Sequence, residues 1–362
     1  MKTVKDWVKD LVRPEVMALS AYHVPETGRL LKLDAMENPW ALPDALRAQW
    51  LQVLESVQIN RYPNPAAPTV KAGLRKMMGL SSQYELLLGN GSDELIQLVA
   101  MALAKPGASV LSVEPSFVMY KMIAQFLGLQ YHGVALTEDF ALDRETLLAA
   151  IKTHQPALVF LAQPNNPTGN LFDATIVEEI IAVTPGLVVV DEAYLAFTDS
   201  DALPLLDRHP NVLIMRTLSK VGLAGLRLGI LAGAPEWIRE IDKLRLPYNI
   251  NVLTQASAAF LLDHYDTFRE QTARLRAART DLIQALRVLP LERVWPSEAN
   301  FVLVRAPAGE ARAVFEALKK SGVLIKCLDG AHPLLKDCLR ITVGTPQENQ
   351  QMLAALEKSL ID

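Results

Sequence analysis

The sequence has few cysteines, no excess of positive charge and no long hydrophobic run. Its two cysteines, Cys327 and Cys338, are too few for a disulfide framework, and no Cys/His spacing suggests a zinc site. A formal net charge of −4, without a basic stripe that interleaves aromatic residues, disfavours nucleic-acid binding. No apolar run approaches the ~18 residues that span a bilayer, and the N-terminal segment alternates charged with apolar residues, unlike a signal peptide. We therefore expect a cytoplasmic protein with no metal, nucleic-acid or membrane partner.

Half of the residues are hydrophobic and 21% are charged, which is typical of a globular protein. The length of 362 residues predicts two or three domains. Between residues 85 and 235, short apolar segments alternate with longer amphipathic ones. The segments expected to form strands are 85–89, 109–113, 157–163, 187–194, 212–218 and 227–233. Continuous Val/Ile/Leu strands joined by helices predict an α/β fold, with a mostly parallel central sheet and helices on both faces.

The C-terminal third of the chain has a different pattern. A long helical stretch is expected at 252–288 and a further helix at 309–321. Shorter apolar segments follow the first of these stretches, and we expect strands at 300–305, 322–326 and 338–344. This mixture predicts a smaller α+β domain.

Ligands of open α/β sheets bind beyond the carboxyl ends of the strands, so the residues that follow each expected strand are the first candidates for a site. The segment "GNGSDELI" begins at Gly89, and its Ser92 and Asp93 are typical of a helix N-cap. Free backbone N–H groups at such a helix start attract a phosphate. An ordinary capped glycine turn is the alternative interpretation.

Two other loops also present candidates. Phe117 lies just past the strand at 109–113, where a flat ligand could stack on it, although core packing would explain it as well. The segment "PNNPTGN" is a rigid loop that presents Asn165 and Asn166 at a strand end. It is either a bare turn or a ligand contact.

Asp191 in "LVVVDEAY" follows four apolar strand residues, where a buried carboxylate is costly without a cationic or protonated partner. A pyridinium N–H would be such a partner. Tyr194, three residues later, can direct its phenol to the same region. A helix-capping Asp beside a core Tyr is the alternative.

Lys220 in "TLSKVGLAGLRLG" stands among small and apolar residues, which is unusual for a solvated lysine. Desolvation and nearby cations lower the pKa of a lysine and free its amine to attack carbonyls. Thr217, Ser219 and Arg227 supply donors suited to a phosphate. A phosphate, a flat ring with a basic nitrogen and an oxygen, and an aldehyde for Lys220 together describe pyridoxal 5′-phosphate.

The order of these segments, with "NRYPNP" at 60–65 before them and "LRITVG" at 339–344 after them, resembles the fold-type I pyridoxal phosphate-dependent aminotransferases. Among these, the chain is similar to the histidinol-phosphate aminotransferases. The resemblance runs from about residue 22 to residue 360. It implies an N-terminal arm at 1–45 that is part of the small domain, a large cofactor-binding domain at 46–255 and a C-terminal small domain at 256–362.

The resemblance also implies roles for the matching residues. Lys220 would be the catalytic residue, which binds the cofactor covalently and then moves a proton. The remaining residues implied to bind the cofactor are Gly91, Ser92, Asp93, Phe117, Asn166, Asp191, Tyr194, Thr217, Ser219 and Arg227, with Tyr62 reaching the cofactor of the neighbouring subunit. The partner would thus be a second copy of the chain, in a homodimer with shared sites.

The same resemblance implies four substrate-binding residues: Tyr22, Asn38, Lys326 and Arg340. Arg340 would grip the anionic group of either substrate. Many members of the family have arginine where this sequence has Lys326. The expected reaction converts histidinol phosphate and 2-oxoglutarate to imidazole-acetol phosphate and glutamate, as part of histidine biosynthesis.

Three other functions stay open at this point. A decarboxylase of a phosphorylated amino acid, such as threonine phosphate, would use the same cofactor and a similar anion pocket. An aromatic amino-acid aminotransferase is the second. A non-catalytic regulator that senses the cofactor is the third, and the lack of any appended DNA-binding segment argues against it.

Overall fold

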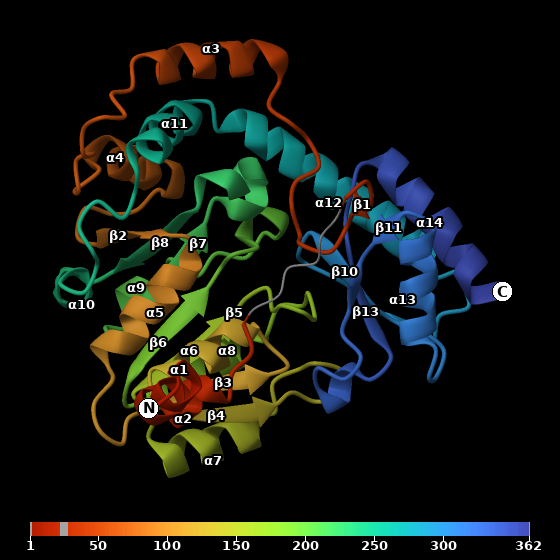
Figure 1. The fold of residues 1–362 in the computed structure, drawn as a ribbon, viewed down its shortest axis with the longest axis horizontal. Helices are drawn as coiled ribbons and strands as arrows, with labels where there is room; N and C mark the ends of the chain where they lie inside the picture. The colour runs from red at the N-terminus through yellow and green to blue at the C-terminus, as the bar shows by residue number, and fades with distance from the viewer. Residues whose placement is uncertain (1, 22–27, 362) are drawn as a thin grey trace.

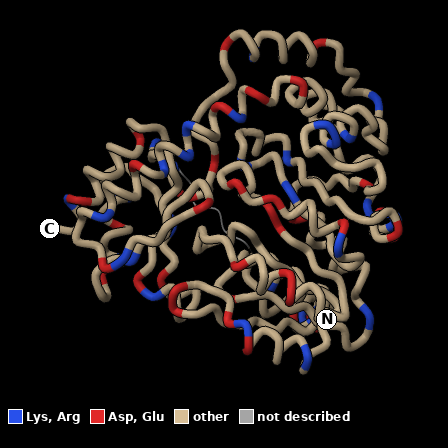
Figure 2. The backbone as a smooth tube through the Cα atoms, turned by 180° about the vertical axis from the view of Figure 1, so that it is seen from behind, with Lys and Arg blue, Asp and Glu red and all other residues tan. Residues whose placement is uncertain are grey.

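A computed structural model describes residues 2–21 and 28–361 of the chain (Figure 1). The chain forms a large unit around a central sheet and a smaller unit that contains the C-terminus. Acidic and basic residues are scattered along the whole trace (Figure 2). No helix in the described part of the chain is long and apolar enough to cross a membrane.

The large unit is built on a seven-stranded sheet in the order β2-β8-β7-β6-β5-β3-β4. The strands β7, β6, β5, β3 and β4 run parallel, whereas β8 is antiparallel to both β7 and β2. The strands are β2 (Glu85–Asn90), β3 (Ser109–Glu114), β4 (Gln130–Ala135), β5 (Leu158–Ala162), β6 (Leu187–Asp191), β7 (Val212–Thr217) and β8 (Leu228–Gly233). The predicted mostly parallel sheet is confirmed.

The sheet is covered on both faces because its strands are apolar on both faces. Leu158 and Phe160 pack with one set of helices, and Val159 and Leu161 pack with the other. The first face is covered by α5 (Ser92–Ala102), α6 (Val118–Phe126) and α10 (Pro235–Asp242). The second face is covered by α4 (Pro68–Met78), α7 (Arg144–His154), α8 (Ala174–Val183), α9 (Leu205–Arg208) and α11 (Val252–Asp263).

The smaller unit has a four-stranded antiparallel sheet in the order β12-β13-β10-β9. Its strands are β9 (Arg293–Val294), β10 (Phe301–Arg305), β12 (Lys326–Cys327) and β13 (Cys338–Thr342). Three helices pack with this sheet in one core: α12 (Asp266–Leu286), α13 (Ala311–Lys320) and α14 (Pro346–Ile361). The predicted α+β composition is therefore present.

The N-terminal arm contacts both units. Its helices α1 (Val4–Leu11) and α2 (Pro14–Met17) lie on the large unit, where the Arg13 guanidinium donates to the Phe126 carbonyl. Further along, β1 (Leu31–Lys32) pairs in parallel with β11 (Val323–Leu324) of the smaller unit. The chain then enters α3 (Asp44–Glu55), which packs on α11.

Several predicted elements differ in detail from the structure. The helical stretch at 252–288 is two helices, α11 and α12, which are separated at His264 and Tyr265. The strand expected at 322–326 is divided between β11 and β12, which belong to different sheets. The strand β4 was not expected because its sequence, QYHGVA, lies at the sheet edge and has only one buried residue. The predicted domain boundary at 255–256 falls inside α11, which packs on α3 and α4, and the three-domain division stays a prediction.

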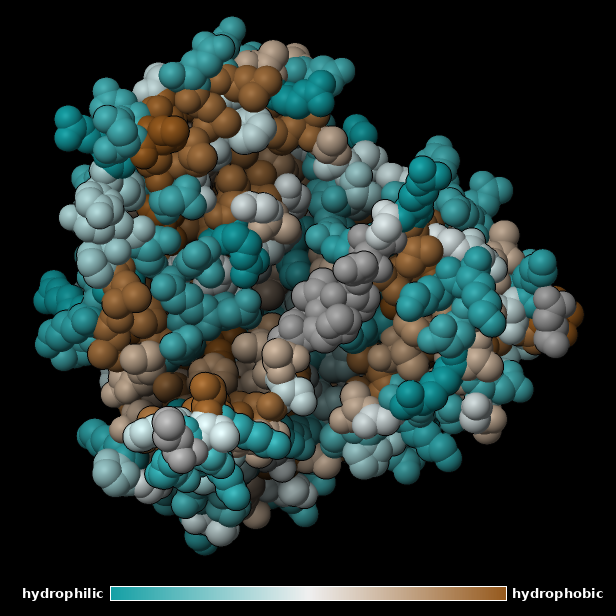
Figure 3. All heavy atoms as spheres, viewed as in Figure 1, coloured by the Kyte–Doolittle hydropathy of each residue, from teal (hydrophilic) through white to brown (hydrophobic). Residues whose placement is uncertain are grey.

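The large unit carries an apolar surface over α3 and α11 (Figure 3). Leu51 of α3 and Leu253 of α11 are both about half exposed, at 51% and 46%. A hollow of about 550 Å³ lies between these helices, lined by apolar residues that include Leu42, Trp50 and Leu54. Monomeric proteins seldom expose a continuous apolar patch of this kind, so the surface is a candidate for contact with another chain.

Candidate active site

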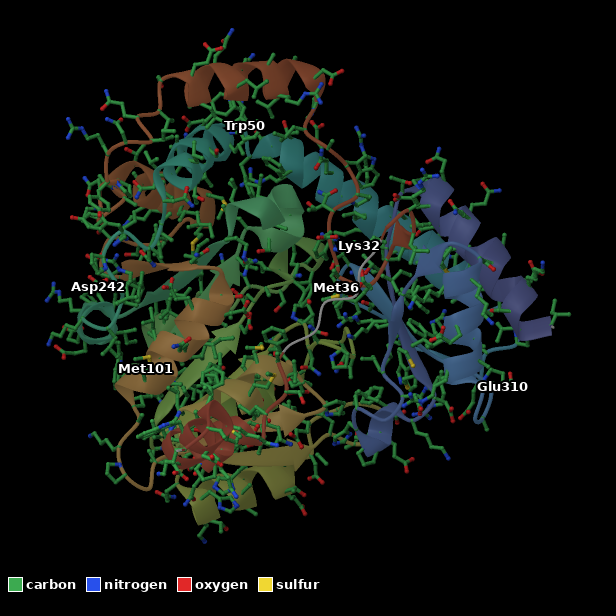
Figure 4. All side chains as sticks on the ribbon, viewed as in Figure 1. Lys32, Met36, Trp50, Met101, Asp242 and Glu310 are labelled. Carbon is green, nitrogen blue, oxygen red and sulfur yellow. The ribbon has the colours of Figure 1, made fainter. Side chains whose placement is uncertain are left out.

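A cavity of about 250 Å³ lies at the carboxyl ends of β5, β6 and β7, which is the place expected for a ligand of such a sheet. Ten of the residues predicted from the sequence line it: Ser92, Asp93, Phe117, Asn166, Asp191, Tyr194, Thr217, Ser219, Lys220 and Arg227. Residues 35–37 of the N-terminal arm also line it. Met36 lies between the two units, so the arm forms one wall of the cavity (Figure 4).

One end of the cavity is built to receive an anion. The helix α5 begins there, and Gly91 is its N-cap, which corrects the expectation that Ser92 and Asp93 form the cap. No side chain caps the first turn, so its N–H groups and the positive end of the helix dipole are available to a ligand. Gly91 has a φ of 82°, and a Cβ there would lie 2.4 Å from Nη2 of Arg227. Only glycine therefore lets the guanidinium approach this turn.

The remaining groups at this end are hydroxyls and one arginine. Thr217 donates from Oγ1 to Oγ of Ser219 at 2.9 Å, and both side chains are buried. Arg227 adopts a left-handed backbone conformation with a φ of 51°, and its Nη2 lies 3.4 Å from Oδ2 of Asp93. Hydroxyl, guanidinium and helix N–H donors form the set that a phosphate monoester requires.

The floor of the cavity holds a buried carboxylate. Asp191 is the last residue of β6 and is 4% exposed. Its Oδ2 accepts from the Tyr120 hydroxyl at 2.6 Å, and its Oδ1 accepts from the backbone N–H of Ala193 at 3.0 Å. Burial raises the pKa of Asp191 to about 6 against these two hydrogen bonds. A cationic N–H from a ligand would lower this pKa again and stabilise the ionised carboxylate.

Tyr120 was not among the predicted residues. Its ring stacks on Phe160 at a centroid distance of 4.5 Å and meets Phe117 edge to face at 5.6 Å. In the sequence it is one of several apolar residues in α6, and no spacing relates it to Asp191, 71 positions later. The parallel sheet brings the two together.

Tyr194 and Asn166 lie together on another side of the cavity, where both could contact the same ligand oxygen. The Asn166 Nδ2 donates to the Tyr194 hydroxyl oxygen at 3.2 Å. Burial raises the pKa of Tyr194, so its phenol stays protonated and can donate to a ligand oxygen. The Oδ1 of Asn166 accepts from Nη1 of Arg340 at 2.5 Å. Asn166 thus joins the phenol to the arginine.

Lys220 lies in a π-helical turn, Ser219–Leu223, directly after β7. Its Nζ donates to the Ala35 carbonyl at 3.3 Å and lies 5.8 Å from the centre of the Tyr194 ring. Burial, assisted by the positive charge of Arg340, lowers the pKa of Lys220 to about 8, although Glu37 and Asp93 oppose the shift. At that pKa about a tenth of the amine is neutral at pH 7, compared with far less than a hundredth for an ordinary lysine.

A second, adjoining cavity of about 400 Å³ holds two of the four predicted substrate residues and shares Met36, Phe117 and Asn166 with the first. Lys326 and Arg340 both line it. These two residues are direct partners across β12 and β13. Arg340 is buried, and its Nη2 donates to the Asp34 carbonyl at 2.9 Å.

Two further predicted residues, Asn38 and Tyr62, do not line either cavity. The Asn38 side chain donates to the Val221 carbonyl and to Gln271, so it anchors the arm to the turn that carries Lys220. Tyr62 is 82% exposed and stacks on Tyr248, and it does not line the cofactor cavity of its own chain. Tyr22 is outside the described residues.

Comparison with known proteins decides the family. The model of the family "Aminotransferase class I and II" matches residues 29–356. The chain belongs to the aminotransferase class I and II family. It is 53% identical to histidinol-phosphate aminotransferase 2 of Nitrosococcus oceani, with 98% of each chain covered. It is also 53% identical to histidinol-phosphate aminotransferase of Chromobacterium violaceum, with 98% of this chain and 99% of the other covered.

A solved structure with the same fold carries the cofactor. Histidinol-phosphate aminotransferase from Sinorhizobium meliloti, in complex with pyridoxal 5′-phosphate, superimposes with a TM-score of 0.87 at 27% identity. The superposition covers 97% of this chain and 98% of that one. The protein is therefore a pyridoxal phosphate-dependent aminotransferase of fold type I, as the sequence predicted.

The residues of this aminotransferase fit the cofactor. The anion end, with its glycine cradle at Gly91, suits the phosphate. The carboxylate of Asp191 accepts two of the about four hydrogen bonds that a carboxylate can accept, so it can also accept one from the ring N–H. The phenol of Tyr194 suits the ring oxygen. The low-pKa amine of Lys220 suits the aldehyde. Among the residues that the structure describes, no group of three or more His, Cys, Asp or Glu side chains could hold a metal ion.

A buried ion pair between Arg216 and Glu192 supports Asp191 and Thr217, which are their neighbours in the chain. Arg216 donates from Nε and Nη2 to Oε2 of Glu192 at 2.8 and 2.7 Å, and its Nη2 also meets Oδ1 of Asp201 at 2.6 Å. The side chains of Arg216 and Glu192 are 7% and 2% exposed. Glu192 follows Asp191, and Arg216 precedes Thr217. The pair therefore connects the ends of β6 and β7, which carry Asp191 and Thr217.

Replacing Arg216 by Met should lower the free energy of unfolding by about 3–5 kcal/mol, because Glu192 would stay buried without its partner. The same variant should bind pyridoxal phosphate more weakly. The double change Arg216→Met with Glu192→Met should regain most of the stability, since an apolar pair of similar volume replaces a buried ion pair at little cost. Urea denaturation of the apoenzyme and absorbance titration with the cofactor measure both effects.

Arg208→Met is the matched control, because Arg208 pairs with Glu178 on the surface, where an ion pair contributes about 0–1 kcal/mol. If Arg216→Met behaved like this control in both measurements, the ion pair would have no part in positioning the site.

Proposed function

We propose that this aminotransferase converts histidinol phosphate and 2-oxoglutarate to imidazole-acetol phosphate and glutamate. The observation that carries the proposal is the pair of cations, Lys326 and Arg340, in the cavity that adjoins Lys220. The planar guanidinium of Arg340 can donate two parallel hydrogen bonds to either a phosphate or a carboxylate. The ammonium of Lys326 adds positive charge without imposing a fixed geometry. The two 53% identical relatives carry the name of this enzyme.

The cofactor supplies the electron-withdrawing ring that makes the carbon next to the substrate nitrogen acidic. Lys220 provides the base, because its amine is partly neutral at pH 7 and lies beside the ring site. Asp191 holds the ring N–H, and Tyr194 with Asn166 holds the ring oxygen. The donors at the start of α5, together with Thr217, Ser219 and Arg227, hold the phosphate. The arm residues 35–37 close one wall and limit the access of water.

One site must accept both glutamate and a phosphate ester. Arg340 supports this, because it lines the second cavity, donates to Asn166 and to the Asp34 carbonyl, and carries a permanent positive charge that attracts either a carboxylate or a phosphate. The alternatives of a threonine phosphate decarboxylase and an aromatic aminotransferase share the same cofactor residues, and the relatives' name favours the histidinol phosphate reaction over both.

We also propose that the enzyme works in the cytoplasm as a homodimer with shared active sites. The apolar surface over α3 and α11 supports contact with a second copy. Further exposed apolar side chains lie in the neighbouring loops: Ile59, Tyr62, Leu246 and Tyr248. The Tyr62 ring stacks on the Tyr248 ring at a centroid distance of 4.5 Å, which holds Tyr62 at the surface. From there its hydroxyl can donate to the cofactor phosphate of a second copy of the chain.

A half-reaction panel tests the substrate. Histidinol phosphate should convert the cofactor absorbance of the wild-type enzyme far faster than phenylalanine or threonine phosphate, and no carbon dioxide should be released from the latter. Arg340→Ala should lower kcat/KM for histidinol phosphate by about 2–5 kcal/mol, or about 30- to 5000-fold, because the substrate anion loses its partner. Arg276→Ala, which removes a surface ion pair with Asp199, is the control.

Arg340→Ala should still bind the cofactor, because Arg340 lines the second cavity and not the first. Equal rates for the three amino donors would contradict the proposed substrate, and an unchanged rate in Arg340→Ala would remove this residue from the site.

Hybrid dimers test the shared sites. Lys220→Ala should be inactive, and Tyr62→Ala should lose most cofactor affinity. If each site takes Lys220 from one chain and Tyr62 from the other, then mixed dimers of the two variants contain one intact site. Refolding an equimolar mixture should therefore restore about a quarter of the wild-type activity, since about half of the dimers are hybrids with one working site each. A mixture as inactive as its parts, with hybrids demonstrated by native mass spectrometry, would exclude sharing.

A further inference from the structure

The second cavity contains a group of polar side chains that neither the cofactor nor the substrate anion uses. Glu114 ends β3, Lys121 belongs to α6 and Tyr131 lies in β4. His332 comes from the smaller unit, in the segment between β12 and β13 that reaches toward the ends of these strands (Figure 1). All four line the same cavity as Lys326 and Arg340.

Glu114 offers a hydrogen-bond acceptor in this cavity. Its Oε1 accepts from Lys121 at 3.1 Å, and its charge adds to the effect of burial in raising the pKa of the neighbouring Tyr131. A carboxylate accepts about four hydrogen bonds, so capacity for a ligand N–H remains. The side chain lies against Gly133, where a Cβ would approach Cδ of Glu114 to 2.4 Å. A side chain at position 133 would displace the carboxylate, so glycine leaves the space that Glu114 occupies.

His332 offers a donor in the same cavity. Its Nδ1 accepts from the backbone N–H of Leu334 at 3.2 Å, which caps the short helical turn Pro333–Leu335. A neutral imidazole that accepts at Nδ1 carries its proton on Nε2. Burial lowers the pKa of His332, and the Lys121 charge adds to this, whereas Glu114 opposes it. The ring is therefore neutral near pH 7 and presents Nε2–H.

We propose that Glu114 and His332 are the specificity-determining residues for the ring of the substrate, and that they bind an imidazole by its two nitrogens. A neutral imidazole has one N–H donor and one acceptor nitrogen. The carboxylate of Glu114 receives the first, and Nε2–H of His332 serves the second. This assignment rests on the proposed function, which places the amine of the substrate at Lys220 and its phosphate at Arg340 and Lys326.

The assignment also explains how one site serves two unlike substrates. Glutamate has no ring, so it leaves Glu114 and His332 in contact with water and with their present partners. An amino alcohol phosphate with an aliphatic side chain would desolvate both groups without replacing those hydrogen bonds. A site built in this way rejects such an analogue strongly.

Two variants of the holoenzyme test the assignment. Glu114→Gln keeps the size and removes the charge. His332→Asn keeps an acceptor for the Leu334 N–H and removes Nε2–H. Glu178→Gln is the control, because this carboxylate pairs with Arg208 at 2.9 Å and does not line the cavity. The amino donors are histidinol phosphate, leucinol phosphate, which has an aliphatic side chain in place of the ring, and glutamate.

Each variant should lower kcat/KM for histidinol phosphate by about 5- to 50-fold and raise its Kd, measured by calorimetry, by a similar factor. Rates with leucinol phosphate should not fall, because the variants remove part of the desolvation cost, and rates with glutamate should stay within about twofold, as should all rates of Glu178→Gln. If Glu114→Gln fails to bind the cofactor, the rates of His332→Asn with the three amino donors test the assignment without it.

A wild-type preference for histidinol phosphate that survives unchanged in His332→Asn would overturn this inference and leave the proposed function standing. An equal loss with all three donors would overturn it too, because it would indicate general damage to the site. Wild-type enzyme that turns over histidinol phosphate no faster than leucinol phosphate would overturn the proposed function, and this inference with it.

Discussion

The amine of Lys220 is kept away from water and beside positive charge, and the arrangement of the site depends on this constraint. Its free-amine fraction at neutral pH follows from burial and from Arg340, which together lower its pKa to about 8. The fold provides both conditions at once. The turn after β7 places the lysine at the sheet edge, the arm residue Ala35 covers it, and β13 of the smaller unit brings the arginine. The low pKa of the amine thus depends on the large unit, the smaller unit and the arm together.

Asn166 connects the two halves of the site. It donates to Tyr194 in the cofactor cavity and accepts from Arg340 in the adjoining one. In the proposed reaction, an anion bound to Arg340 would therefore change the surroundings of the Tyr194 phenol. The same contact joins the large unit to the smaller one, since Asn166 follows β5 and Arg340 lies in β13. Substrate binding and domain contact thus share residues.

The sequence predicted the strand-end residues of the site well. Asp191, Thr217 and Lys220 each stand at or just after a buried apolar run, and a parallel sheet must bring such positions to one edge. The family resemblance then supplied the cofactor, and the comparisons agree with it. The roles of the individual residues stay predictions, although ten of the twelve expected at the cofactor line one cavity.

Other features leave no local signal. Tyr120 contacts Asp191 only because β3 and β6 belong to one sheet, and Arg216 meets Glu192 across neighbouring strands. The strand β4 is too polar to be recognised from an apolar run. The segment 322–326 passes from one sheet to another at Ile325. Its residues 323–325 are all apolar, so the sequence gives no sign of the change. Each of these depends on tertiary contacts between distant parts of the chain.

Borohydride reduction tests whether the buried amine of Lys220 binds the cofactor aldehyde. The holoenzyme is reduced, digested and analysed by mass spectrometry, with cofactor-free protein as the control. We expect a single pyridoxyl phosphate group on the peptide that contains Lys220, and loss of that adduct in Lys220→Ala. A cofactor adduct on another lysine, or none on this peptide, would contradict this role of Lys220.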